Sequence, residues 1–296
     1  MIAVLCACSR ESDDAVSRID RLDLAIENGD SLTAVMAGEF SAWCEITGFS
    51  GSAADYAESA AMRMFGPIVN AEITSLDSVE RVLGPALNGF DTRPVAVISP
   101  YRQAVVTHPD GYTFIALNHY LGPDNDAYAG FPAHERKRKK LAMLPVDVMQ
   151  ALMAEKYSDQ PSDDDTVLSH LLYHGALLNA VAKALPAETP DSTLLGMTAD
   201  ELRWCEANER RVWQTLIERK LLFDRFDNEG RRLFANAPHS TAINAAAPGR
   251  AALFTALQIA RSYEKATGST PLPIPEFYAD KQTLIKSKYT PENAAN

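Results

Sequence analysis

The spacing of apolar residues divides the chain into a helical N-terminal part, a short stretch of strands and a long helical remainder. Between Val16 and Leu87, apolar side chains recur every three or four positions, which is the spacing of an amphipathic helix. Glycine and proline interrupt this pattern and predict that it forms several short helices. The expected breaks are at residues 29–30, 48–52 and 66–67.

From Arg93 onward the pattern becomes that of strands. Residues 95–98, 103–107 and 112–117 are rich in β-branched and aromatic side chains and come close to alternation. The sequence His-Pro-Asp-Gly at 108–111 is a strong turn signal, so the second and third segments should form a hairpin. A sheet of this size is too small to be the whole core. The predicted fold class is therefore α+β, mainly helical, with a small antiparallel or mixed sheet packed against several helices.

The rest of the chain contains several residues that are typical of helix starts. A proline suits the first turn of a helix, an aspartate can cap its free N–H groups, and a Thr-x-x-Glu pattern forms a capping box. The starts expected on these grounds are Pro145 for helix 146–155, Asp165 for helix 166–185, Thr198 with Glu201 for helix 198–220, and Pro248 for the helix that follows it. The tail after Gly268 carries four prolines and should wrap over the surface, with a short helix at 280–286.

Charge argues against nucleic acid as a partner. The 296 residues include 39 acidic and 28 basic side chains, a formal net charge of -11, which repels phosphate backbones. The run from Arg136 to Lys140 is the one basic segment that would favour a nucleic-acid partner. It follows a Gly-Phe-Pro turn and is interpreted as the solvated start of a helix, because a charge run this short is usually surface.

The first eight residues, M-I-A-V-L-C-A-C, have the pattern of a bacterial lipoprotein signal, in which a cysteine becomes acylated. Leu5 stands three positions before Cys8, but the charged start and the apolar core of about 7 to 15 residues are nearly missing. Either the true start lies upstream or the match is chance, and we favour the anchor. The prediction is a remnant signal over residues 1–8 with a lipidated Cys8, a tether over 9–15, and the lipid bilayer as a partner. No later apolar stretch approaches the roughly 18 to 20 residues that span a bilayer.

Two cysteines remain after such a signal. Cys44 and Cys205 each follow a tryptophan inside an apolar helical pattern, so buried free thiols are expected, with a disulfide between them left open. The chain has no Cys-x-x-Cys pair, and a structural zinc site made of cysteines is therefore excluded.

His170 and His174 stand one helical turn apart and could offer two imidazoles to one metal ion. Leu171 occupies the place of the glutamate that serves as general base in the H-E-x-x-H motif. A zinc ion would also need a third protein donor, for which no residue is fixed by spacing. The candidates are Glu201, Glu206 and Glu209. Histidines hydrogen-bonded in the core are the favoured interpretation, so no cofactor is predicted, and zinc bound by the two histidines is the alternative.

Several ordered segments of the chain resemble the gliding-motility lipoprotein family GldB. They cover most of the chain after the N-terminal signal, and their order and spacing make the likeness fairly specific. The segments are 16–20, 118–125 with Tyr128, 144–149, 198–209 with Trp213, 248–250 and 258–263. The resemblance implies a single domain over residues 16–296.

GldB is similar in turn to zincin-like peptidases, so the resemblance implies a zincin-like arrangement of a sheet against helices. In that arrangement the helix at 146–155 takes the place of the H-E-x-x-H helix without histidines. Tyr173-His174-Gly175 takes the place of the segment with the third zinc ligand, where GldB members usually have a glutamate before the glycine. The implied protein is a non-catalytic binding or scaffold component, anchored to the cell envelope and facing the periplasm or the surface, with envelope proteins as partners. The alternative is a divergent zinc metallopeptidase that uses His170 and His174.

The GldB-like segments also supply the candidate binding residues. These are Asn118, Tyr120, Asn208, Glu209 and Arg250. No catalytic residue is predicted. A structural role is favoured for these segments, with Arg250 near a helix start forming an ion pair with a residue such as Glu209. A weaker hypothesis is a small-molecule site in a cleft near residues 118–120.

Overall fold

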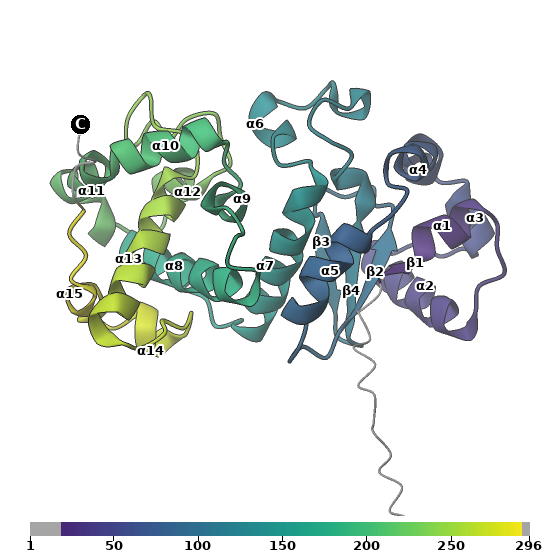
Figure 1. Cartoon of the computed structure of the whole chain (residues 1–296), viewed down its shortest axis with the longest axis horizontal. Coiled ribbons are helices and arrows are strands. Elements are labelled where there is room, and N and C mark those ends of the chain that lie inside the picture. Colours follow the sequence, from purple (N-terminus) through teal and green to yellow (C-terminus); the bar gives the residue numbers. More distant parts are fainter. Residues whose placement is uncertain (1–18, 292–296) are drawn as a thin grey trace, which may run out of the picture.

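The computed structural model describes residues 19–291 and shows a mainly helical fold around a small mixed sheet (Figure 1). The strands are β1 (Asp20–Arg21), β2 (Arg93–Val97), β3 (Val105–His108) and β4 (Tyr112–Ala116). Their order in the sheet is β1-β2-β4-β3, with β1, β2 and β4 parallel and β3 antiparallel to β4. The predicted hairpin is therefore confirmed. The remnant signal with Cys8 and the tether at 9–15 lie outside the described residues.

Strand β1 was not predicted. Its two residues, Asp20 and Arg21, pair with Val95 and Ala96 of β2, but a two-residue polar strand leaves no alternating pattern in a sequence. The helical periodicity that starts at Ile19 belongs to the helix directly after it.

The first group of helices lies beside the sheet at one end of the molecule (Figure 1). Its members are α1 (Leu22–Glu27), α2 (Ala34–Thr47), α3 (Ala53–Ala57) and α4 (Ala60–Glu72). Helix α5 (Asp77–Ala86) follows them and packs against α7 in the middle of the molecule (Figure 1). The indole of Trp43 donates a hydrogen bond to the hydroxyl of Tyr56 (2.8 Å), which donates to the carbonyl of Ile98 (2.9 Å). These bonds connect α2 and α3 to the end of β2.

The break expected at Gly66 and Pro67 is wrong, because α4 runs through both residues. Proline removes one backbone donor from the helix interior, but Met62 and Val69 on either side are buried and hold the helix together by packing. The breaks expected at 29–30 and 48–52 are confirmed.

The remaining helices follow the sheet and form the other end of the molecule, with α7 between the sheet and α8 (Figure 1). The α-helices are α6 (Ala133–Arg136), α7 (Leu144–Lys156), α8 (Val167–Ala184), α9 (Asp191–Leu195), α10 (Ala199–Ala207), α11 (Glu209–Glu218), α12 (Asn228–Phe234), α13 (Ala251–Thr267), α14 (Pro275–Tyr278) and α15 (Thr283–Ser287). Short 3-10 helices are η1 (Leu117–His119), η2 (Asp126–Tyr128), η3 (Leu141–Met143) and η4 (Leu221–Phe223). The start at Pro145, the Thr198–Glu201 capping box and a short helix near 280–286 are confirmed.

Helices α8 and α13 cross closely, and Gly175 allows it. A Cβ on Gly175 would collide with the backbone carbonyl of Ala256 on α13. The glycine is therefore required for the close contact of the two longest helices of the described chain.

Two helix boundaries differ from the prediction. Thr166, not Asp165, caps α8 by accepting from the N–H of Ser169 (3.2 Å), while Asp165 closes the preceding loop by accepting from the N–H of Ser162 (2.8 Å). The helix expected over 198–220 divides at Asn208, whose side-chain amide donates back to the carbonyl of Trp204 (2.8 Å). Asparagine competes with the helical hydrogen-bond pattern in this way and ends helices.

Pro248 does not open the next helix. It forms a β-bridge with His239, and Gly249 lies so close to the backbone of Ala237 that a Cβ there would collide with it. Helix α13 therefore begins only at Ala251, after Arg250 adopts a left-handed conformation (φ 68°).

The cysteines of the described chain are free: Cys205 is buried and Cys44 is half-buried, so the disulfide left open by the sequence is not formed. Within residues 19–291, no helix combines the length and the apolar character that crossing a membrane requires.

Candidate functional site

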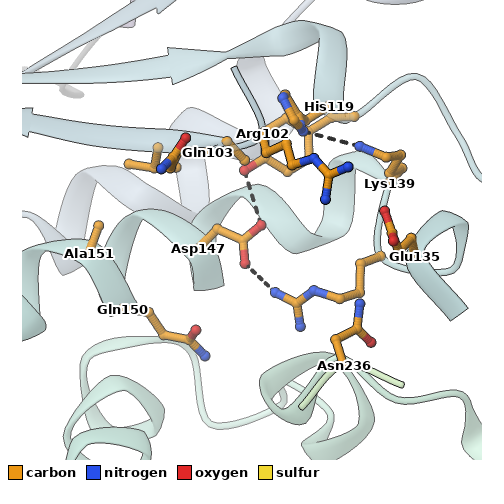
Figure 2. A pocket seen from close by; sticks show the side chains of 13 residues that line it. Arg102, Gln103, His119, Glu135, Lys139, Asp147, Gln150, Ala151 and Asn236 are labelled. Atoms are coloured by element: carbon orange, nitrogen blue, oxygen red, sulfur yellow. Dashed lines mark hydrogen bonds and ion pairs between the residues drawn. The ribbon is translucent and has the colours of Figure 1, made fainter. Parts of the chain in front are cut away.

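A polar pocket of about 500 Å³ opens between the sheet and α7. Figure 2 shows Asp147 pointing into it from α7, Gln150 and Ala151 further along the same helix, and Glu135 and Lys139 on the other side. The lining residues are Arg102, Gln103, Ala104, Val105, His119, Tyr120, Glu135, Arg138, Lys139, Asp147, Gln150, Ala151 and Asn236. Four separate segments of the chain thus meet around one carboxylate.

Asp147 is the centre of the hydrogen bonding in the pocket. Arg138 donates from Nη2 to one carboxylate oxygen (2.8 Å), and the hydroxyl of Tyr120 donates to the other (3.1 Å). Burial raises the pKa of Asp147, and the nearby Arg138 opposes this shift. Burial also raises the pKa of Tyr120 well above its ordinary value, so its hydroxyl remains a donor. These bonds hold Asp147 and Arg138 in fixed orientations.

Gly196, at the end of α9, lies against the guanidinium of Arg138. It has a left-handed backbone (φ 63°), and a Cβ on it would collide with Nη1 and Cζ of the arginine. Nη1 itself is buried and has no hydrogen-bond partner among the described residues. One amino group of Arg138 is thus used by Asp147, and the other is held in place with nothing to donate to.

Arg250 lies behind this pair. Burial and the neighbouring Arg138 together lower the pKa of its guanidinium to about 9, and Asp147 opposes both effects. Its Nε is buried and without a partner in the described chain. The ion pair expected with Glu209 is not formed, because Glu209 instead accepts a hydrogen bond from the hydroxyl of Tyr289 (2.8 Å). Two arginines therefore face one aspartate.

Lys139 and His119 together form one wall of the pocket. The ammonium of Lys139 lies 3.1 Å from Nδ1 of His119 and over the rings of Tyr128 and Phe131, 4.9 and 4.7 Å from their centroids. Nε2 of His119 faces the carbonyl of Tyr101 at 3.0 Å, so this nitrogen donates and Nδ1 accepts. Burial and the charge of Lys139 together lower the pKa of His119 to about 4. The imidazole is therefore neutral at pH 7.

The interpretation of residues 136–140 as a solvated surface run is wrong. The side chains of Lys137, Arg138 and Lys139 are only 12%, 19% and 9% exposed, respectively. Lys137 donates to Glu201 at 2.8 Å, and the other two line the pocket. Three of the five basic side chains thus point inward, toward Glu201, Asp147 and His119.

The predicted binding residues separate into two groups. Tyr120 lines the pocket, and Arg250 lies beside it. Asn118 instead binds the backbone of Ser99 through both ends of its amide, at 3.0 and 2.9 Å. Asn208 ends α10, and Glu209 is bound to the C-terminal tail.

The two candidate metal ligands lie in a different place, within an aromatic cluster. His170 stacks on Phe226, with ring centroids 3.5 Å apart, and its Nε2 donates to the carbonyl of Ser162 (3.0 Å). The ring of His174 packs against Phe234, and burial lowers its pKa to about 4. The ring centroids of the two histidines are 6.4 Å apart.

This donor set does not fit a zinc ion. Residues 19–291 contain no group of three or more His, Cys, Asp or Glu side chains that could hold a metal. Of the candidate third donors, Glu201 is bound to Lys137 and Glu209 to Tyr289. The surroundings of His170 and His174 are those of packed core histidines.

A family model described as gliding motility protein GldB matches residues 78–291. The chain belongs to the GldB family. Comparisons with curated proteins and with solved structures gave no match. The span matched to GldB contains every residue that lines the pocket, whereas helices α1 to α4 precede it.

Three of the GldB-like segments meet at this pocket. Segment 118–125 supplies Tyr120, segment 144–149 supplies Asp147, and segment 248–250 supplies the arginine behind them. Residues of the pocket that sequence reasoning missed include Arg138, Lys139 and Asn236. The available signal was a basic run in an acidic protein directly before a helix with an aspartate in its first turn.

Proposed function

We propose that this GldB family member is a non-catalytic binding component of the cell envelope, anchored by a lipid on Cys8, and that the pocket around Asp147 is its binding site. The observation that carries the proposal is the content of the pocket. It presents fixed hydrogen-bonding groups in a concave site, as binding sites do. In the described chain it presents neither an activated nucleophile nor a set of metal ligands.

We also infer a zincin-like scaffold without its chemistry, and this inference rests on the GldB match. In a zincin, the first of two helices presents two histidines and a general base to the active site. Here the face of α7 that lines the pocket carries Asp147, Gln150 and Ala151. Asp147 is occupied by Arg138 and Tyr120, and Ala151 has no polar atom. The helix α7 therefore presents neither the histidine ligands nor the free base that water activation by the usual route requires.

Assignment to the envelope rests on the GldB match and on the residue pattern around Cys8. The decisive experiment is metabolic labelling with a clickable palmitate analogue, with the gene expressed from its own chromosomal locus. We expect a labelled protein whose processing is inhibited by globomycin. Cys8→Ser should abolish the label and Cys6→Ser should retain it, because only Cys8 has the leucine three positions before it. Labelling that survives Cys8→Ser would refute this anchor.

The absence of catalysis needs its own test. Purified protein would be analysed for bound zinc and incubated with a fluorogenic peptide library, with and without added zinc. We expect substoichiometric zinc and no turnover above the buffer control. Turnover that is lost on mutation of His170 or His174 to alanine would establish the peptidase alternative instead.

A further inference from the structure

We infer that the pocket around Asp147 binds a single carboxylate, carried by the C-terminal end of a short peptide or by a free amino acid. This inference rests on the proposed non-catalytic binding role and names the chemistry of the ligand. It is argued from the charges that line the pocket, from buried polar atoms without partners and from the arrangement of donors and acceptors.

The charges that line the pocket favour a ligand with one negative charge. Three basic side chains and two carboxylates line it, an excess of one positive charge in a chain with a net charge of -11. These residues are Arg102, Arg138, Lys139, Glu135 and Asp147. The two lining carboxylates would repel a dianionic phosphate more strongly than a carboxylate, which carries a single negative charge.

Two buried polar atoms next to the pocket have no partner in the described chain. They are Nη1 of Arg138 and Oδ1 of Asn236, and both residues line the pocket. Buried groups of this kind are rare in native proteins unless water or a ligand satisfies them. The wall of the pocket thus carries unpaired polar groups, as the wall of a site for a polar ligand does.

The Arg138 guanidinium is pre-organised for an anion. Its Nη2 is fixed on Asp147 and its other side is enclosed by Gly196, so it cannot swing away. Arg102 makes no ion pair with any residue in 19–291 and lines the pocket from the sheet side (Figure 2). Arg102 can therefore hold one planar carboxylate, the geometry that arginine recognises best, while Arg138 contributes its positive charge from a fixed position.

The hydrogen-bond acceptors in the pocket indicate that the ligand carries N–H groups beside its carboxylate. Glu135 lies across the pocket from α7 (Figure 2) and can accept N–H groups from the residue that carries the carboxylate. A simple fatty acid or acetate has no such donors. A peptide end or an amino acid has both functions within one residue, and a pocket of about 500 Å³ has room for it.

The test is isothermal titration calorimetry on the full-length protein. The probes are N-acetyl-trialanine with a free carboxylate, the same peptide as its C-terminal amide, free alanine, sodium acetate and inorganic phosphate. We expect the peptide acid to bind at least tenfold more tightly than the amide, than acetate and than phosphate. Free alanine distinguishes the two sources: tighter binding of alanine identifies an amino-acid site, and tighter binding of the peptide acid identifies a peptide-end site.

Variants connect the binding to the pocket. Arg102→Gln and Arg138→Gln should each weaken binding of the preferred probe at least tenfold. Arg102 is exposed and makes no ion pair within residues 19–291, so its variant remains informative if Arg138→Gln fails to fold. Arg211→Gln, an exposed arginine on α11, removes the same charge elsewhere and should leave the affinity unchanged.

Failure can be assigned to one proposal or the other. Equal affinity for acid and amide, tighter binding of phosphate, binding of none of the probes, or indifference to Arg102→Gln overturns the carboxylate inference while leaving an anchored, non-catalytic lipoprotein intact. Cleavage of the peptide during the titration, detected by mass spectrometry, overturns the non-catalytic role itself.

Discussion

Gly196 is a backbone support for Arg138: the space where its side chain would stand is filled by the guanidinium of the arginine. The two residues are far apart in sequence, and their contact joins the end of α9 to the wall of the pocket. Because Arg138 in turn orients Asp147, the glycine determines the geometry of the charged groups without touching the pocket interior.

Gly196→Ala should therefore lower both stability and pocket integrity. An alanine would meet the guanidinium and also adopt a left-handed backbone, which by itself costs about 1 kcal/mol. Gly48→Ala is the matched control, since Gly48 also ends a helix at φ 65° but has open space around its Cβ position. We expect urea denaturation to show a loss of about 1 kcal/mol for Gly48→Ala and at least twice that for Gly196→Ala. Equal losses would show that the contact with Arg138 is unimportant.

Asp147→Asn should be strongly destabilising. It leaves the Arg138 and Arg250 guanidinium groups without their common counter-charge in a largely buried position. Loss of one partner of such a pair costs about 3 kcal/mol, and adding Arg138→Gln should recover part of the loss. The control is Asp200→Asn, whose exposed pair with Arg203 should contribute less than about 1 kcal/mol. Additive effects of Asp147→Asn and Arg138→Gln in a double-mutant cycle would argue against a coupled pair.

Stability should fall as the solution becomes acidic. Burial holds the pKa of His119 and of His174 at about 4, below the ordinary value of 6.5. The unfolded chain thus takes up protons first, so this contribution is complete above about pH 6.5 and is lost as the pH falls toward 4. Lowering the pH from 7 to 5 should reduce the free energy of unfolding by on the order of 1 kcal/mol for each of the two histidines.

The pH effect can be assigned with variants. Chemical denaturation at the two pH values should show a smaller difference for His119→Gln, whose amide can still donate to the carbonyl of Tyr101. The variant His239→Gln replaces an exposed histidine and should retain the parental difference. A His119→Gln protein with the parental pH dependence would contradict the assigned origin.

Asn118→Ala should lower the stability of the protein without weakening ligand binding, although Asn118 is only two positions from Tyr120 of the pocket. Its amide makes two hydrogen bonds to the backbone of Ser99, and their loss leaves buried polar groups unpaired at a cost of about 2 kcal/mol. The affinity for the preferred carboxylate probe should change less than threefold, because Asn118 does not line the pocket. Denaturation and calorimetry on the same preparation measure both quantities. A large loss of affinity at unchanged stability would place Asn118 in the site.

Local signals in the sequence predicted most elements of the fold. The hairpin of β3 and β4 follows from alternation around a Pro-Asp-Gly turn, and the capping box at Thr198 was recognisable because its partners are three residues apart. The errors came from interactions between distant residues. Helix α4 continues through Pro67 because of packing, and α13 begins late because Gly249 is pressed against Ala237.

The pocket was harder to predict for the same reason. Tyr120 and Arg250 were singled out on family likeness, yet their common partner Asp147 was not. The basic run at 136–140 was misread because its partners, Asp147 apart, are distant in the sequence: Glu201, His119 and the support at Gly196. A charged side chain looks like surface in a sequence until its counter-charge is known.

Strand β1 also has a mechanical consequence for an anchored protein. If a lipid holds the N-terminus, tension along the chain reaches the body at Asp20 and Arg21, whose parallel pairing with β2 is then loaded in shear. The N–H of Ile19 is fastened to the carboxylate of Glu80 on α5 (2.8 Å), so the same pull is shared with a helix that packs on α7. A force applied at the membrane would thus be transmitted to α7, the helix that lines one side of the pocket.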